Sequence, residues 1–212
     1  MPDARCPMPD ARCPMPDARC PMPNYQLPII DPSQLTMSVN LSPKQLGMAN
    51  LIEDIDEILA ETGCEPSCLK LEITESAIVE NVMKANIVFA QLKDRNIRLL
   101  IDDFGTGYSS LSYLHRFPLD TLKIDRSFVS RLGAVENGDD GGQPLQIVRA
   151  IVTLAHNLGL NAIAEGVETG EQLAQLRELG CELAQGYWFS KPLDSFAVTE
   201  MLINLGNRAI MD

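Results

Sequence analysis

Short apolar runs alternate along this chain with longer segments in which apolar residues recur every three to four positions. The short runs predict strands at 35–42, 68–74, 97–102, 119–125 and 160–166, and a sixth within 181–189. The longer segments predict helices at 42–63, 75–94, 145–158 and 169–179, a short one around 111–115, and a last one from Asp194. Strands that alternate with helices favour a parallel sheet covered by helices.

Local signals sharpen the limits of the first of these helices. Ser42 is suited to cap the first helix, Pro43 to occupy its first turn and Gly63 to end it. The helix at 75–94 is expected to make its apolar contacts through Ile78, Val82, Ile87 and Phe89.

Polar residues stand at or just after the carboxyl end of every predicted strand. They are Asn40, Glu72, Asp102, Asp103, Lys123, Glu165 and Gln185. A (β/α)8 barrel builds its active site from many strand ends, whereas a doubly wound sheet uses one crevice with a glycine-rich loop. No G-x-G-x-x-G motif follows the first strand, so the pattern predicts an α/β fold of the TIM-barrel type. With about six strand–helix units, such a barrel is incomplete.

Carboxylates that converge at one rim of a barrel repel one another unless cations lie between them. Oxygen ligands suit Mg²⁺ or Mn²⁺, and the adjacent Asp102 and Asp103 could serve two ions. A two-metal site activates water and stabilises the leaving oxygen of a phosphodiester, with Lys123 as an added positive charge. The alternative is that strand-end carboxylates merely cap helices. That alternative explains one or two of them, but not a series on successive strands.

Composition limits the partners and the compartment. The formal net charge is −12 and the isoelectric point is near 4.6, which disfavours binding to a nucleic acid polymer. No run approaches the roughly 20 apolar residues of a membrane span. Beyond the N-terminal repeat the cysteines are Cys64, Cys68 and Cys181, an odd number typical of free thiols in a cytoplasmic protein.

The unit Met-Pro-Asp-Ala-Arg-Cys-Pro is repeated in tandem at the start of the chain. Two prolines in each unit exclude a heptad helix. A zinc site from Cys6, Cys13 and Cys20 would lack closely spaced ligand pairs, so a disordered tail is the favoured interpretation. The expected organisation is therefore a repeat tail at 1–23 and a domain at 24–212.

Six motifs in order resemble those of the EAL domain family. They are SVNLSPKQL, LEITES, IDDFGTGYSSLSYL, LKIDRSFV, AIAEGVET and QGYWFSKPL. The family consists of bacterial phosphodiesterases with a (β/α)8-type barrel, which hydrolyse cyclic di-GMP to linear pGpG with two Mg²⁺ or Mn²⁺ ions. The resemblance covers about 35–193. It implies cyclic di-GMP as the partner and a homodimer through the glycine-loop region.

The resemblance also implies residue roles. Metal ligands would be Asn40, Glu72 and Asp102, with Asp103 for the second ion and Glu165 as a ligand or base-like residue. Lys123 would contact the water or phosphate, and Gln185 would hydrogen-bond in the site. Glu75 and Glu168 would support the glycine loop and its neighbours.

One departure from the family concerns its Glu-Ala-Leu strand, whose glutamate is a metal ligand. This strand does not occur in the sequence, and we expect an N-terminally truncated domain with little or no phosphodiesterase activity. Two alternatives remain open. The chain could be a non-catalytic module that binds cyclic di-GMP or a protein partner, or an inactive fragment of a disrupted gene.

Overall fold

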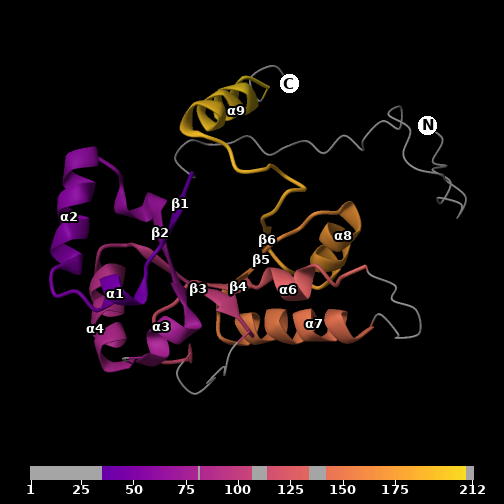
Figure 1. Cartoon of the computed structure of the whole chain (residues 1–212), viewed down its shortest axis with the longest axis horizontal. Coiled ribbons are helices and arrows are strands. Elements are labelled where there is room, and N and C mark those ends of the chain that lie inside the picture. Colours follow the sequence, from indigo (N-terminus) through magenta and orange to yellow (C-terminus); the bar gives the residue numbers. More distant parts are fainter. Residues whose placement is uncertain (1–34, 81, 107–113, 134–141, 209–212) are drawn as a thin grey trace, which may run out of the picture.

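The computed structural model describes residues 35–80, 82–106, 114–133 and 142–208. Within them lies one parallel sheet in the sequential order β1-β2-β3-β4-β5-β6, curled as part of a barrel (Figure 1). The strands are β1 (Met37–Asn40), β2 (Leu69–Thr74), β3 (Arg98–Phe104), β4 (Thr121–Ile124), β5 (Asn161–Ala164) and β6 (Leu183–Ala184). The predicted α/β fold with an incomplete TIM-type barrel is confirmed.

Helices accompany the strands as the alternating pattern predicts. They are α1 (Pro43–Leu46), α2 (Leu51–Thr62), α3 (Glu75–Glu80), α4 (Val82–Asp94), α6 (Arg126–Val129), α7 (Gly142–Asn157), α8 (Gly170–Glu178) and α9 (Ser195–Arg208), with a 3-10 turn at Pro66–Cys68. In Figure 1, α1 to α4 lie beside β1 to β3, whereas α6 to α8 accompany β4 to β6. None of the described helices is long and apolar enough to cross a membrane.

The single helix expected at 42–63 is two helices. Ser42 caps α1 in a reciprocal capping box with Gln45, and Gly47 ends it after one turn. Glycine is a poor helix former, so the chain leaves the helix there and starts again at Leu51. Gly63 ends α2 in the left-handed conformation, as expected.

One further prediction needs correction. Ile78 and Phe89 are buried as expected, but Ile87 is 61% exposed, because α4 turns Val88 and Phe89 inward. The sixth strand, expected within 181–189, covers Leu183–Ala184. A Cβ at Gly186 would collide with the backbone of Val167, so the chain turns tightly there. The short helix α6 was not predicted, and most of the helix expected at 111–115 lies outside the described residues.

Side-chain alternation along the strands separates the core from the site. Leu71, Ile73, Leu99, Ile101, Leu122, Ile124, Ala162 and Ala164 belong to the hydrophobic core under the helices. The intervening residues project to the opposite face of the sheet, because successive side chains of a strand alternate. Glu72 and Lys123 are such residues, and both are buried. The concave face of the curled sheet therefore carries the polar residues.

Both edges of the sheet lack a partner strand within the described part of the chain. All residues of β1 are exposed, including Met37 and Val39. Helix α9 lies apart from the helices that flank the sheet, and its Phe196 is 71% exposed (Figure 1).

Candidate functional site

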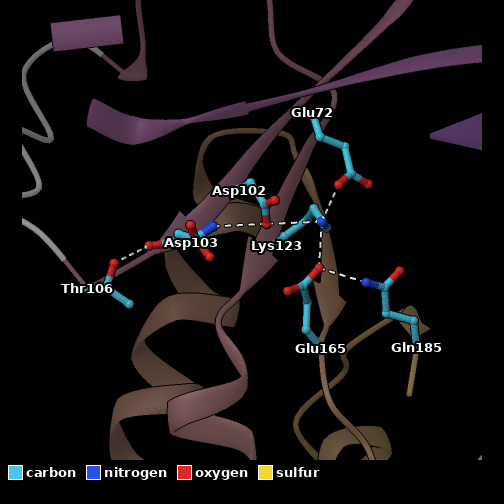
Figure 2. A network of polar contacts seen from close by, with 7 residues as sticks. All are labelled: Glu72, Asp102, Asp103, Thr106, Lys123, Glu165 and Gln185. Carbon is cyan, nitrogen blue, oxygen red and sulfur yellow. Dashed lines mark hydrogen bonds and ion pairs between the residues drawn. The ribbon is translucent and has the colours of Figure 1, made fainter. Parts of the chain in front are cut away.

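The ammonium group of Lys123 is surrounded by carboxylates from neighbouring strands (Figure 2). Its Nζ lies 2.5 Å from Oε2 of Glu72, 3.0 Å from Oδ1 of Asp102 and 2.5 Å from Oε1 of Glu165. These four residues come from β2, β3, β4 and the end of β5. Parallel strands with sequential order bring their carboxyl ends to one rim, which explains the assembly.

Lys123 is 3% exposed, so its charge depends on these partners. Burial disfavours the ammonium form, but the hydrogen bonds to Glu165, Glu72 and Asp102 outweigh it and raise the pKa of Lys123. Burial also raises the pKa of Glu165, against the opposing influence of Lys123. The cluster thus holds one cation among three carboxylates and keeps an excess of negative charge.

A break in the regular register of β3 brings two adjacent aspartates into one site. The pairing with β4 shifts between Ile101 and Phe104, and Asp103 has φ 56°. Adjacent side chains of a regular strand point to opposite faces, whereas such an irregularity redirects one of them. The backbone N–H of Asp103 donates to Oδ1 of Asp102 at 3.0 Å. Burial raises the pKa of Asp103, and repulsion from the carboxylate of Asp102 raises it further.

Gln185 fixes the orientation of Glu165. Its Nε2 donates to Oε1 of Glu165 at 2.7 Å, the same oxygen that contacts Lys123. The backbone continues the sheet at both residues, because Glu165 N–H donates to the carbonyl of Ile124 and Gln185 N–H to that of Ala164. Glu165 is therefore held by the sheet and by two side chains.

The donor set fits a hard divalent cation. Carboxylate oxygens of Asp102, Asp103 and Glu165 lie within 4.8 Å of one another. Such oxygen donors are those that Mg²⁺ and Mn²⁺ prefer. Lys123 already neutralises part of this charge, so a cation at the cluster would share the carboxylates with it.

A pocket of about 370 Å³ adjoins the cluster through Glu165 and Gln185. Arg126, Glu168 and Lys191 also line it. Nη2 of Arg126 donates to Oε1 of Glu168 at 2.6 Å. Sequence reasoning missed Arg126 and Lys191; the signal for Arg126 is its position just after the end of β4, where functional residues of barrels gather.

Asn40 and Glu75 come from β1 and from the start of α3. Asn40 is exposed at the end of β1, opposite Glu72 in the register, with no hydrogen bond to the cluster among the described contacts. Glu75 is half-buried at the start of α3. Most of the glycine loop, at 107–113, lies outside the described residues, so its support by Glu75 and Glu168 stays a prediction.

Several known proteins are similar to this chain in sequence and in fold. A cyclic di-GMP phosphodiesterase, NbdA of Pseudomonas aeruginosa, is 43% identical over 169 residues, which is 80% of this chain and 21% of that protein. The PaMucR phosphodiesterase in complex with c-di-GMP has a TM-score of 0.71 and 39% identity, covering 77% of this chain and 64% of that one. The manganese/cy-diGMP complex of Klebsiella pneumoniae BlrP1 has a TM-score of 0.65 and 32% identity, covering 74% of this chain and 39% of that one.

The chain spans about a fifth to a quarter of the length of the curated relatives that it matches first. The model of one family, the EAL domain, matches residues 25–192. This match covers most of the chain and all six strands, and the chain therefore belongs to the EAL domain family.

Proposed function

We propose that this site acts on cyclic di-GMP, as a phosphodiesterase that releases linear pGpG with two Mg²⁺ or Mn²⁺ ions. The observation that carries the proposal is the carboxylate cluster around Lys123 at the rim of the curled sheet, next to an open pocket. The similarity to a curated cyclic di-GMP phosphodiesterase supports the same substrate.

Asp102, Asp103 and Glu165 would hold the ions, with Glu72 and Asn40 as the further ligands that the family resemblance implies. Bound there, divalent ions supply Lewis acidity toward phosphoryl oxygens and lower the pKa of water. The two carboxylates from β3 and the one that follows β5 have the charge and the spacing for this role.

The protein's own groups position and stabilise the reacting phosphodiester. Lys123 stays protonated because its pKa is raised, so it offers a fixed positive charge to the phosphoryl oxygens in the transition state. Glu165, held by Lys123 and Gln185, is oriented to accept a proton from the attacking water. Both groups are held in place before substrate binds, which lowers the cost of reorganisation.

We further propose that this chain by itself turns over cyclic di-GMP slowly. Its 212 residues contain no Glu-Ala-Leu sequence, so the metal ligand that the resemblance assigns to that strand is not among them. Asn40, a further ligand that the resemblance implies, is exposed on β1, whose outer edge has no partner strand in the described part of the chain. Loss of groups that orient a metal site costs about 10- to 100-fold in metal affinity or activity.

The experiment is a turnover assay of the whole chain with cyclic di-GMP, in Mg²⁺ and in Mn²⁺, with separation of pGpG from substrate. We expect slow formation of pGpG that Glu165→Gln abolishes, whereas the matched surface variant Glu57→Gln on α2 retains it. The domain of a homologue with the Glu-Ala-Leu strand provides the reference rate. A rate equal to that reference would contradict the proposed impairment.

Calorimetry with cyclic di-GMP separates the alternatives. Binding without any turnover would replace the phosphodiesterase proposal with a non-catalytic binding module. Neither binding nor turnover would leave an inactive fragment.

A further inference from the structure

The turn that carries Glu165 is held from two sides by groups that the proposed chemistry does not use. Glu165 directly follows β5, and its backbone N–H donates to the carbonyl of Ile124 at 3.1 Å. Residues 166–169 then lead the chain into α8. Because one carboxylate oxygen of Glu165 contacts both Lys123 and Gln185, its direction depends on where this turn lies.

The segment that follows β6 holds one side of the turn. The backbone N–H of Val167 donates to the carbonyl of Gln185 at 3.0 Å, and the N–H of Trp188 donates to the carbonyl of Val167 at 2.9 Å. A Cβ at Gly186 would collide with the backbone of Val167, so the two segments are in close contact. The turn therefore cannot shift toward β6.

The side chain of Arg126 crosses the other side of the turn. Its methylene groups lie where a Cβ of Gly166 would be, and Gly166 has φ +71°, a conformation that glycine adopts without strain. Beyond Gly166, Nη2 of Arg126 donates to Oε1 of Glu168 at 2.6 Å. One side chain thus contacts the residue after Glu165 and the residue that precedes the N-cap of α8.

Both ends of this connection are anchored. Asp125 caps α6 by accepting the backbone N–H of Ser127 at 2.9 Å, which fixes the backbone at Arg126. At the other end, the backbone N–H of Glu168 donates to Oε1 of Gln172 at 2.8 Å, and Gln172 is itself buried. Arg126 therefore ties the turn to two fixed points of the fold.

The exposure of this ion pair separates a local role from a role in stability. The side chains of Arg126 and Glu168 are 62% and 44% exposed, and exposed ion pairs contribute little to the stability of a fold. Groups that orient a metal ligand have a much larger effect on the site, about 10- to 100-fold in metal affinity or activity.

We propose that Arg126 is a positioning residue, which directs the carboxylate of Glu165 toward the divalent ions by fixing the turn through Gly166 and Glu168. This inference rests on the proposed function for the ions and the reaction. Arg126 acts through the backbone of the turn, so its loss changes the cluster without removing any group from it.

The test compares variants of the whole chain. Arg126→Met keeps methylene groups over Gly166 and removes the ion pair, whereas Arg126→Lys keeps a cation. Arg95→Met is the matched control, because it removes another partly exposed ion pair, between Arg95 and Asp56 on α2, with the same change of net charge. Calorimetry measures the affinity for Mn²⁺ alone, and a turnover assay at saturating Mn²⁺ measures kcat and KM for cyclic di-GMP.

We expect Arg126→Met to bind Mn²⁺ about tenfold more weakly and to lower kcat about tenfold at unchanged KM. The direction is diagnostic, because loss of a positive charge near the site would by itself strengthen cation binding. Arg126→Lys should recover most of both losses. Arg95→Met should match the wild type in Mn²⁺ affinity and in kcat, and the urea midpoints of the two Met variants should be similar.

Unchanged or stronger Mn²⁺ binding to Arg126→Met would overturn this inference, as would an equal loss in Arg95→Met. A raised KM at unchanged kcat would assign Arg126 to substrate binding instead. Absence of turnover by the wild type would overturn the proposed function alone, since Mn²⁺ affinity still decides the role of Arg126. Absence of Mn²⁺ binding to the wild type would overturn both.

A second variant keeps the test decisive should Arg126→Met fail to fold by circular dichroism. Glu168→Gln removes the same ion pair from its other end, and Glu171→Gln, an exposed carboxylate in the first turn of α8, is its charge-matched control. Glu168→Gln should weaken Mn²⁺ binding more than Glu171→Gln does. Equal Mn²⁺ affinity of these two variants would overturn the inference.

Discussion

Lys123 shows how a single residue governs the cluster. A buried ammonium costs several kcal/mol to desolvate, and carboxylates in a low-dielectric site are equally costly without a counter-charge. The buried ammonium and the buried carboxylates therefore depend on each other. Glu72 is 8% exposed and Lys123 is 3% exposed, and Oε2 of Glu72 lies 2.5 Å from Nζ of Lys123. Before any ligand binds, the site thus holds one cation among three carboxylates and keeps an excess of negative charge.

Replacing Lys123 should destabilise the fold and strengthen cation binding. Lys123→Met leaves buried carboxylates without their counter-charge, and we expect a loss of about 3 kcal/mol in the free energy of unfolding. Mn²⁺ should bind the variant more tightly than the wild type, because the ammonium no longer shares the carboxylates. Urea unfolding and Mn²⁺ titration measure the two effects.

The comparison variant is Lys93→Met, which removes the partly exposed ion pair between Lys93 and Asp120. Its loss of stability should stay within about 1 kcal/mol. Equal stability of Lys123→Met and the wild type, or weaker Mn²⁺ binding to it, would contradict this account of the cluster.

At the scale of elements, Glu182 joins α7 to the edge of the sheet. Its Oε1 lies 2.6 Å from Nε2 of His156, and its Oε2 accepts the backbone N–H of Ala162 at 2.9 Å. Burial alone would raise the pKa of Glu182, but these hydrogen bonds outweigh it and lower the pKa from its ordinary 4.5. The carboxylate form thus helps to attach β6 and α7 to β5.

This lowered pKa predicts a dependence of stability on pH. The unfolded chain takes up a proton at Glu182 at a higher pH than the folded chain does. The stabilisation is therefore present in full above pH 4.5 and is lost as pH falls through the lowered pKa. Between pH 6 and about pH 3, the wild type should lose more stability than Glu182→Gln. Urea midpoints at several pH values measure this difference, and parallel curves for the two proteins would refute it.

At the scale of the whole molecule, the sheet is curled but open. Strand β1 exposes both Met37 and Val39, and its outer edge has no partner strand in the described part of the chain. An exposed apolar edge with free backbone N–H and C=O groups pairs readily with another strand. Helix α9 also exposes apolar side chains, among them Phe196. The open edge therefore favours association with other chains.

Charge on β1 should reduce this association. We expect the wild type to self-associate with rising concentration in sedimentation experiments. Val39→Lys should raise the concentration of half-association about tenfold, which corresponds to about 1.4 kcal/mol. Met83→Lys, which changes an 81% exposed residue of α4 away from this edge, should leave it unchanged. An equal rise in the concentration of half-association in both variants would contradict a role for the β1 edge and assign the association to surface apolarity in general.

The sequence by itself determined the alternation of strands and helices, and with it the rim at which polar residues gather. Periodicity and the helix signals of Ser42 and Gly63 depend on neighbours in the chain, which is why they could be read from it. Ile87 shows the limit, because an apolar residue on a helix turns outward when its neighbours pack better.

Tertiary structure alone decided how the rim residues meet. The irregularity at Asp103 depends on the pairing of β3 with β4. Lys123 is central because three other strands bring their carboxylates to it. The pocket of Arg126 and Lys191 joins segments that are 65 residues apart in the sequence. Each of these is a contact between residues distant in sequence. Local preferences carry no information on such contacts, whereas the register and curl of the sheet fix them.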